Sequence, residues 1–501
     1  MATKSYSAVL STMDQYMPRM STSMALVFET PDAERAVNNL TIGLRRMNRH
    51  LSYLRGRVFE IAHGRLELRW TVYDEPVLPK LMPAELVSSF SAVTFQQLKD
   101  QRAPLHYFPA SISPAPIFGD FKTAGMPAFA VNYAPLASGG LVMCCSFHQN
   151  VVDFTGAVEI LRLWAAFTSS PLLDKAIPAP DPDEPFRRGL ILRLAMHRPV
   201  PVDEKPISTE EILAHHPEIA LAPSLAPEEH SFAKEVPVAG LSTIFTLDLA
   251  QLEKTRAALR AVNDVAAKAS IDTVVFAILW SCITRVRATR GRAEAGDRVP
   301  ADTATAAESK LSISVDMRAH LDPACFPPWG PRPFLGNVTK YNLTRVPLAK
   351  LESAAAGHCD EGLSALAKIV VVIHSSLASE NRESIIDIAR LGEQARDASV
   401  FRPGWGSFGG PDLSVSSWAN MGDPIYTSDW GGVGKIEFVR LVENEWDGVL
   451  AVMPRKWEKP ETGTEPGVIE VCVSLRKDDM ETLRKDRALS SYLLVEGLRT
   501  A

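Results

Sequence analysis

The stretch SFHQNVVDFTG, at residues 146–156, decides the fold. It continues the apolar run LVMCCSF at 141–147, which predicts a central strand, and it leads into 154–167, whose apolar spacing predicts a helix. A strand-to-helix junction places side chains and backbone N–H groups at the open end of a sheet, where ligands bind in α/β folds. His148 and Asp153 are therefore candidate cleft residues, although a lone histidine at a strand end is more often structural.

Helical and strand-like patterns alternate on both sides of this junction. In the first half, an amphipathic helix is predicted at 31–49 and half-buried strands at 57–59 and 66–70. The second half repeats the mixture, with strands predicted at 243–247, 311–315, 436–441, 448–453 and 468–475, and helices at 249–261, 274–286 and 478–486. Because 501 residues are too many for one hydrophobic core, the pattern predicts an α/β protein with two comparable domains.

Proline marks the expected connection between the domains. Twelve of the 36 prolines fall within residues 168–240, and proline at this density favours an extended segment. We therefore predict an N-terminal domain at 1–185, a proline-rich crossover linker at 186–240 and a C-terminal domain at 241–501.

The composition excludes several classes of partner. With 53 basic and 59 acidic residues the net charge is -6, whereas nucleic acid or an anionic membrane surface favours a basic protein. Six cysteines without a CxxC pair indicate neither a zinc site nor a disulfide framework. No apolar run approaches 18 residues and no leader pattern is seen, so we expect no membrane span and a cytoplasmic protein.

A second candidate segment lies far along the chain. It comprises SVSSW at 414–418 and DWGGVG at 429–434. Three glycines within four positions, next to an aspartate and a tryptophan, demand special backbone geometry or the close approach of another segment. A connection between two strands would require the same glycines, so this segment alone does not define a function.

These two segments, in this order and at this separation, resemble the motifs of the CoA-dependent BAHD acyltransferases. That family carries HxxxD at a strand end and, later in the chain, a Ser-Trp element followed by DFGWG. The resemblance is greatest to its fungal branch, typified by trichothecene 3-O-acetyltransferases, and covers nearly the whole chain. Further points of resemblance are LSTMDQYMPR at 10–19, LRGRV at 54–58, ISVDMRAHL at 313–321, Gly336-Asn337 and residues 467–479.

The resemblance implies two chloramphenicol-acetyltransferase-like domains with a tunnel between them. The implied reaction is acyl transfer from an acyl-CoA to a hydroxyl or amine of a fungal secondary metabolite, such as a terpenoid, polyketide or alkaloid. Acyl-CoA would be a co-substrate, with no permanently bound cofactor and no metal. We also expect a monomer that binds a small molecule and neither nucleic acid nor a membrane.

One residue of the first motif departs from the family pattern. The family's catalytic histidine lies four residues before the motif aspartate, and this position is Gln149, whereas His148 takes the place of a preceding histidine. A glutamine amide cannot act as the general base that removes the proton of an acceptor hydroxyl. Loss of that base costs roughly 10²–10⁴ in rate. His148 can replace it only through an irregular turn, so His148 and Gln149 both remain candidate catalytic residues.

The resemblance assigns supporting roles to other residues. Asp153 would hold the turn through an ion pair, for which Arg318 is the candidate partner. The expected structural residues are Asp153, Gly156, Arg318, Asp429, Gly431 and Gly434, and the expected tunnel-lining residues are Ser416 and Trp418. For Trp418, a place in the hydrophobic core is the competing interpretation.

Two alternatives to acyl transfer remain open. Without a base, the tunnel would fold a flexible substrate for cyclisation or isomerisation, as in a pericyclase or Diels-Alderase, with His148 or Gln149 polarising a carbonyl. The chain would otherwise be an inactive binding protein.

Two further segments carry weaker signals. Residues 399–411 are rich in glycine and aromatic residues and form either a mobile lid or an ordinary loop. The pair His215-His216 lies in the predicted linker and is interpreted as solvated.

Overall fold

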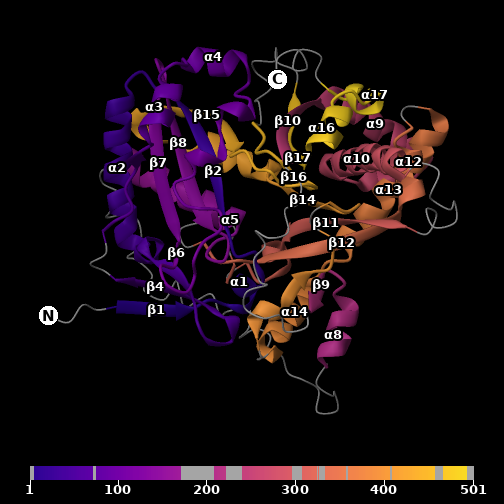
Figure 1. Cartoon of the computed structure of the whole chain (residues 1–501), viewed down its shortest axis with the longest axis horizontal. Helices are drawn as coiled ribbons and strands as arrows, with labels where there is room; N and C mark the ends of the chain where they lie inside the picture. Colours follow the sequence, from indigo (N-terminus) through magenta and orange to yellow (C-terminus); the bar gives the residue numbers. More distant parts are fainter. Residues whose placement is uncertain are drawn as a thin grey trace.

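The structure, a computed structural model, describes residues 5–71, 75–170, 208–221, 240–295, 307–323, 325–326, 333–356, 359–395, 397–406, 409–456 and 467–493. Two α/β halves lie side by side, one built from the first part of the chain and the other mostly from the second part (Figure 1). Each half has its own sheet and helices, so the predicted two-domain α/β fold is confirmed.

The sheet of the first half has five strands in the order β15-β2-β8-β7-β5. In that order they span Lys435–Leu441, Ser21–Glu29, Gly140–His148, Phe129–Pro135 and Lys80–Leu81. β8 is buried along its whole length, as its uninterrupted apolar sequence predicts for a central strand. Helices α2 (Ala33–His50) and α5 (Phe154–Ser169) pack together, and Trp164 of α5 donates a hydrogen bond to the Leu40 carbonyl of α2 (2.9 Å).

A smaller sheet of the first half has the order β1-β4-β3-β6. Its strands span Ser5–Val9, Leu66–Thr71, Arg57–Glu60 and Met126–Pro127, and the short helices of this half are α1 (Thr12–Tyr16), α3 (Ala84–Phe90) and α4 (Phe95–Asp100). α1 packs against α14 (Arg382–Gln394) of the second half, where Thr12 donates to a Glu393 carboxylate oxygen (3.0 Å). α1 therefore lies at the boundary between the halves.

The sheet of the second half has six strands in the order β10-β17-β16-β14-β11-β12. In that order they span Gly240–Asp248, Val468–Arg476, Val449–Val452, Leu413–Ser417, Glu308–Asp316 and Thr339–Pro347. The helices of this half include α9 (Leu249–Val262), α10 (Ile271–Ala295), α12 (Leu348–Ala354), α13 (Asp360–Ala378), α16 (Lys477–Leu483) and α17 (Arg487–Ser490). The short helix α15 (Gly422–Tyr426) packs instead against α5 and β15 of the first half. The apolar run of α10 is buried, as the sequence predicts.

Strand β15 crosses from the second part of the sequence into the sheet of the first half, where it pairs antiparallel with β2 (Figure 1). The predicted C-terminal domain at 241–501 includes this strand, so the two sheets do not follow a single cut in the sequence. Gly434 precedes β15 with φ 114°, and a Cβ atom there would lie 1.9 Å from the Glu29 carbonyl oxygen. The limits 1–185 and 186–240 stay predictions, because 171–207 and 222–239 lie outside the described residues.

Part of the predicted linker is folded. It contains α8 (Thr209–His215) and β9 (Ile219–Leu221), which pairs with β13 (Phe401–Pro403). The interpretation of His216 as solvated is wrong, because it is 3% exposed and its Nδ1 lies 2.8 Å from a Glu218 carboxylate oxygen. Burial acts to lower the pKa of His216, but hydrogen bonds to Asp387 and Glu218 raise it overall.

Helix α13 was not anticipated as a membrane candidate. Within the part of the chain that the structure describes, it is the one helix whose length and mean hydropathy of 1.4 would suffice to cross a membrane. The core helices of soluble proteins pass the same test, so this is weak support for a span. α13 packs against α9, α10 and α12, with Leu366, Ile369, Val370 and Ile373 in the core of the second half.

Candidate active site

The turn between β8 and α5 carries the residues of the first motif. Strand pairing ends at His148, whose carbonyl accepts a hydrogen bond from the Val151 N–H (2.8 Å). The Asn150 side chain donates to the carbonyls of Asp14 and Met17 (2.6 and 2.8 Å). These bonds fix the turn against the segment around α1.

Asp153 caps α5 and is saturated with hydrogen bonds. Its Oδ1 accepts from the Gly156 N–H (2.9 Å) and Arg318 Nη2 (3.0 Å), and its Oδ2 accepts from Arg318 Nη1 (2.8 Å) and the Val338 N–H (2.9 Å). The expected partner of Asp153 is thus in place, in an ion pair that is almost fully buried. Burial raises the pKa of Asp153, although the positive charge of Arg318 opposes this change.

Gly156 allows the second half to approach α5 closely. A Cβ atom at this position would lie 2.4 Å from the Leu335 carbonyl oxygen. Arg318 also donates to the carbonyls of Phe334 and Gly336 (3.1 and 2.8 Å), which holds the same segment against the turn. The motif glycine is therefore required by packing between the halves.

A cavity of about 130 Å³ lies between the halves at this turn. Its lining from the first half is Met17, Thr22, Met24, Phe147, Gln149, Val152, Asp153, Phe154 and Ala157, and its lining from the second half is Ser314, Asn337, Thr339, Tyr341, Ser416 and Trp418. The Trp418 ring stacks on Phe154, with centroids 3.9 Å apart. This cavity brings Gln149 together with Ser416 and Trp418, although these residues are far apart in the sequence.

Gln149 lines this cavity from the position directly after β8. Its backbone N–H donates to the Met20 carbonyl (2.9 Å), and its own carbonyl accepts from Asn337 Nδ2 (2.9 Å). Its side-chain Nε2 donates to the Thr22 hydroxyl on the neighbouring strand β2. With Nε2 engaged and no partner for Oε1 among the described residues, that oxygen is available to a ligand.

His148 lies outside both this cavity and the one beside it. Its side chain is fully buried, its Nδ1 accepts from the Asn150 N–H (3.3 Å), and its ring packs edge-to-face against Phe121 (5.4 Å). Burial, helped by the positive charge of Arg19, lowers the pKa of His148 to about 3. The catalytic role predicted for His148 stays a prediction, and the placement of this side chain does not favour it.

A second cavity of about 350 Å³ adjoins the first and shares Met17 and Tyr341 with it. Its aromatic lining is Tyr16, Phe118, Phe121, Tyr341, Phe401 and Trp405, and its charged lining is Arg19, Glu60, Asp120, Lys122 and Arg402. The rings of Tyr16, Tyr341 and Trp405 follow one another at 5.7 and 5.1 Å. The volume and the aromatic walls are typical of a small-molecule site.

The segment at 399–411 contributes to this second cavity. Phe401, Arg402, Pro403 and Trp405 line it. Phe408 lies outside the described residues, and the proposed motion of this segment stays a prediction.

The glycine motif at 429–434 serves the fold. Asp429 accepts a hydrogen bond from the Gly431 N–H (2.7 Å), and Gly431 has φ 60°. Trp430 is buried between Phe28 and Trp164, with ring centroids 5.3 and 5.5 Å away. No residue of this motif lines either cavity, so its role is to lead the chain into β15.

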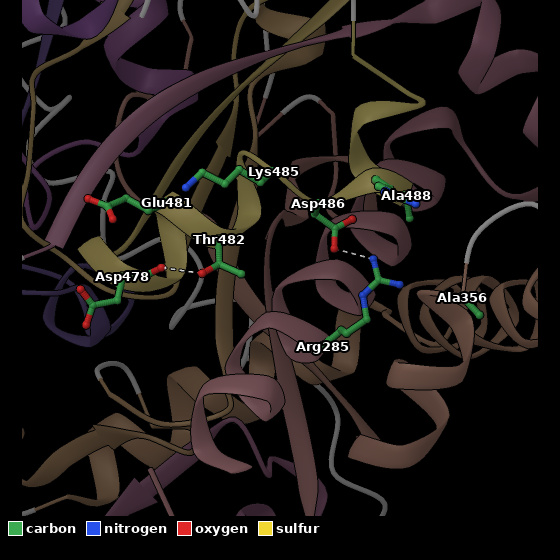
Figure 2. Close-up of a pocket in the computed structure, with 9 residues that line it drawn as sticks. Arg285, Ala356, Asp478, Glu481, Thr482, Lys485, Asp486 and Ala488 are labelled. Carbon is green, nitrogen blue, oxygen red and sulfur yellow. Dashed lines mark hydrogen bonds and ion pairs between the residues drawn. The ribbon is translucent and has the colours of Figure 1, made fainter. Parts of the chain in front are cut away.

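Other parts of the described chain contain weaker candidates for a functional site. A hollow of about 800 Å³ near α16 and α17 is walled by charged side chains (Figure 2). Within it Arg285 pairs with Asp486 (2.5 Å), and Thr482 donates to the Asp478 carbonyl (2.9 Å). None of the predicted site residues lies there, and no group of three His, Cys, Asp or Glu side chains among the described residues is arranged to hold a metal.

A family model described as the Transferase family matches residues 2–489 of this chain. The chain belongs to this family, the BAHD acyltransferases. Trichothecene 8-O-acetyltransferase of Fusarium sporotrichioides is 26% identical over 509 residues, and the match covers 97% of each chain. Eremophilane O-acetyltransferase ORF8 of Penicillium roqueforti is 22% identical over 417 residues, which is 80% of this chain and 78% of that protein.

Solved BAHD structures share the fold. The crystal structure of F. graminearum TRI101 complexed with coenzyme A and deoxynivalenol superposes with a TM-score of 0.71 at 18% identity, covering 97% of this chain and 99% of that one. The resemblance found in the sequence and the chloramphenicol-acetyltransferase-like architecture are thereby confirmed. That Gln149 replaces the BAHD catalytic histidine stays a prediction from the motif spacing.

Sequence reasoning missed several lining residues of this BAHD site. Met17 and Tyr16 lie in the segment 10–19, which was noted as family-like but received no role. Thr22 faces the cavity because β2 pairs with β8 in a register that sets Thr22 opposite Phe147. That register is a tertiary feature, and nothing in the sequence around Thr22 indicates it.

Proposed function

We propose that this protein transfers an acyl group from an acyl-CoA to a nucleophilic group of a small secondary metabolite. The observation that carries the proposal is the cavity that joins Gln149, Ser416 and Trp418 in a BAHD chain. The relatives named above are O-acetyltransferases, which supports acetyl-CoA as the first donor to test. By analogy with TRI101, CoA would act as a co-substrate that enters and leaves.

The lining of the cavity suits a thioester carbonyl. Trp418 and Tyr341 line it, and neither the Trp418 Nε1–H nor the Tyr341 hydroxyl has a hydrogen-bond partner among the described residues. Burial raises the pKa of Tyr341 to about 12, so this hydroxyl keeps its proton. Neutral donors of this kind stabilise the charge that develops on the carbonyl oxygen during acyl transfer.

Gln149 would orient the acceptor. Its Oε1 accepts a hydrogen bond from the N–H or O–H of the acceptor and directs the lone pair toward the thioester carbon. The new bond to that carbon forms and the tetrahedral intermediate collapses with cleavage of the C–S bond. CoA leaves as the thiolate, which takes up the proton of the acceptor.

Two other activities remain alternatives. A cyclase would use the same neutral donors to polarise a carbonyl, and an inactive binding protein would bind ligand without turnover. The relatives do not favour the cyclase. The proposed acyltransferase would act as a cytoplasmic monomer.

The proposal is tested by incubating the purified protein with isotopically labelled acetyl-CoA. Binding of acetyl-CoA should raise the melting temperature of the protein, because a ligand that binds only the native state stabilises it by mass action. Ser416→Trp, which fills the cavity, should abolish this rise, whereas Ser353→Trp on the exposed surface of α12 should retain it. A product that lacks the labelled acyl group would identify the protein as a cyclase. Acetyl-CoA binding that is unaltered in Ser416→Trp would show that this cavity is not the acetyl-CoA site.

A further inference from the structure

We infer that the acceptor group is an amine, which attacks as the neutral free base, and not an alcohol. This inference rests on the proposed acyl transfer and narrows its substrate class. The relatives are named O-acetyltransferases, so the inference separates the acceptor of this chain from the acceptors that those names imply. The inference follows from the lining of the cavity, which determines whether a side chain can take up the proton of the acceptor.

Among the residues that the structure describes, no group that lines the 130 Å³ cavity is a suitable base. Among the lining residues only Asp153 and Tyr341 have titratable side chains. All four donors around Asp153 are hydrogen bonded to its two oxygens, so the carboxylate is fully engaged. Tyr341 already carries its proton, and Gln149 has an amide that does not accept one.

His148 does not supply the missing base either. Its Nε2 is buried without a partner among the described residues, and its ring packs against Phe121, which lines the second cavity in place of His148. Because burial disfavours its charged form, His148 is a weak proton acceptor even if Phe121 moves aside.

An amine and an alcohol differ in when they lose a proton. A neutral amine attacks through its lone pair and loses a proton only after the C–N bond has formed. An alcohol needs a base during its attack. Burial also favours the neutral form of an amine, since it lowers the pKa from about 10 in water.

A phenol or enol would have to enter as an anion. Burial disfavours that anion, and none of the described residues that line the 130 Å³ cavity has a cationic side chain. Among the described residues, the neighbouring cavity does have cations in its lining, namely Arg19, which pairs with Glu60 (2.7 Å), Lys122 and Arg402.

The proposed step balances without another reactant. The amine nitrogen bonds to the thioester carbon while one of its N–H groups donates to Gln149 Oε1. The C–S bond then breaks, and the nitrogen proton passes to the CoA thiolate. The products are an amide and free CoA.

The test compares 2-phenylethylamine with 2-phenylethanol and 4-ethylphenol, using acetyl-CoA and a longer acyl-CoA, with release of free CoA thiol and product mass as readouts. The wild-type protein should prefer the amine by about 10²-fold in kcat/KM, the size of the effect of a missing general base. This rate should rise with pH at a midpoint that follows the pKa of the amine used. Gln149→His and Gln149→Glu, which supply a base, should lower the preference to within about tenfold.

The surface variant Gln96→His adds the same side chain far from the cavity lining and should leave the preference unchanged. Equal or better transfer to the alcohol or the phenol by the wild type would overturn the inference while the proposed acyl transfer stands. Transfer to none of the three acceptors with either donor would count against both. Two base-supplying variants are used so that a folding failure of one does not decide the result.

Discussion

The side-chain amide nitrogen of Gln149 donates a hydrogen bond to the Thr22 hydroxyl across the β8–β2 pair. In this arrangement the nitrogen of the amide is engaged, and its oxygen is left for a ligand in the cavity that Gln149 lines. Thr22, a residue of β2 in the lining of the same cavity, would then determine how Gln149 holds the substrate. Thr22 is accordingly a positioning residue in this account.

Thr22→Val keeps the shape of the side chain and removes the oxygen that accepts from Gln149. We expect kcat for acyl transfer to fall roughly five- to tenfold, the equivalent of one hydrogen bond of about 1 kcal/mol, with little change in KM. Thr22→Ser retains the hydroxyl and should restore most of kcat. Steady-state kinetics that show wild-type kcat for Thr22→Val would rule out this role.

Arg318→Met leaves the Asp153 carboxylate buried without its ion-pair partner. The free energy of unfolding should fall by about 3–5 kcal/mol, since an uncompensated buried charge is costly. The matched control is Arg292→Met, because Arg292 is 63% exposed in its pair with Glu352 and its loss should cost under about 1 kcal/mol. Urea denaturation measures both, and equal losses would contradict the account of the turn.

Gly156→Ala would place a Cβ atom 2.4 Å from the Leu335 carbonyl oxygen. The two halves would have to separate locally, so we expect a loss of stability of about 1–3 kcal/mol together with weaker acyl-CoA binding. Gly291→Ala on α10 is the control, because nothing lies within 4 Å of a Cβ there. That control should be neutral or slightly stabilising, as alanine favours helix more than glycine does.

The lowered pKa of buried His148 should make the protein less stable in acid. Its pKa is about 3 in the folded chain and about 6.5 when unfolded. The unfolded state therefore binds the proton first, and stability that is fully present above pH 6.5 is lost as the pH falls toward 3, by up to about 1.4 kcal/mol per pH unit. His148→Leu should flatten the fall of the melting temperature between pH 6.5 and 4, and an unchanged slope would show that His148 is not the group responsible.

The sequence was informative where local pattern decides structure. The apolar run of β8 and the periodicity of α2 and α10 matched the observed elements, and the resemblance to the BAHD family suggested the pairing of Asp153 with Arg318. The crossing of β15 into the first sheet was not predictable, because strand periodicity does not name a partner strand. The burial of His216 was missed for a similar reason, since Glu218 and Asp387 meet it only in the folded chain.

The central claim is that Gln149, and not His148, contacts the reacting groups. The measurement that tests it most directly is kcat for transfer of a labelled acyl group by Gln149→Ala and by His148→Asn, with melting temperatures to confirm folding. The account predicts a loss of at least about tenfold for Gln149→Ala, and a change of less than about threefold for His148→Asn. A loss of 10²-fold or more in His148→Asn, with Gln149→Ala near the wild type, would contradict it.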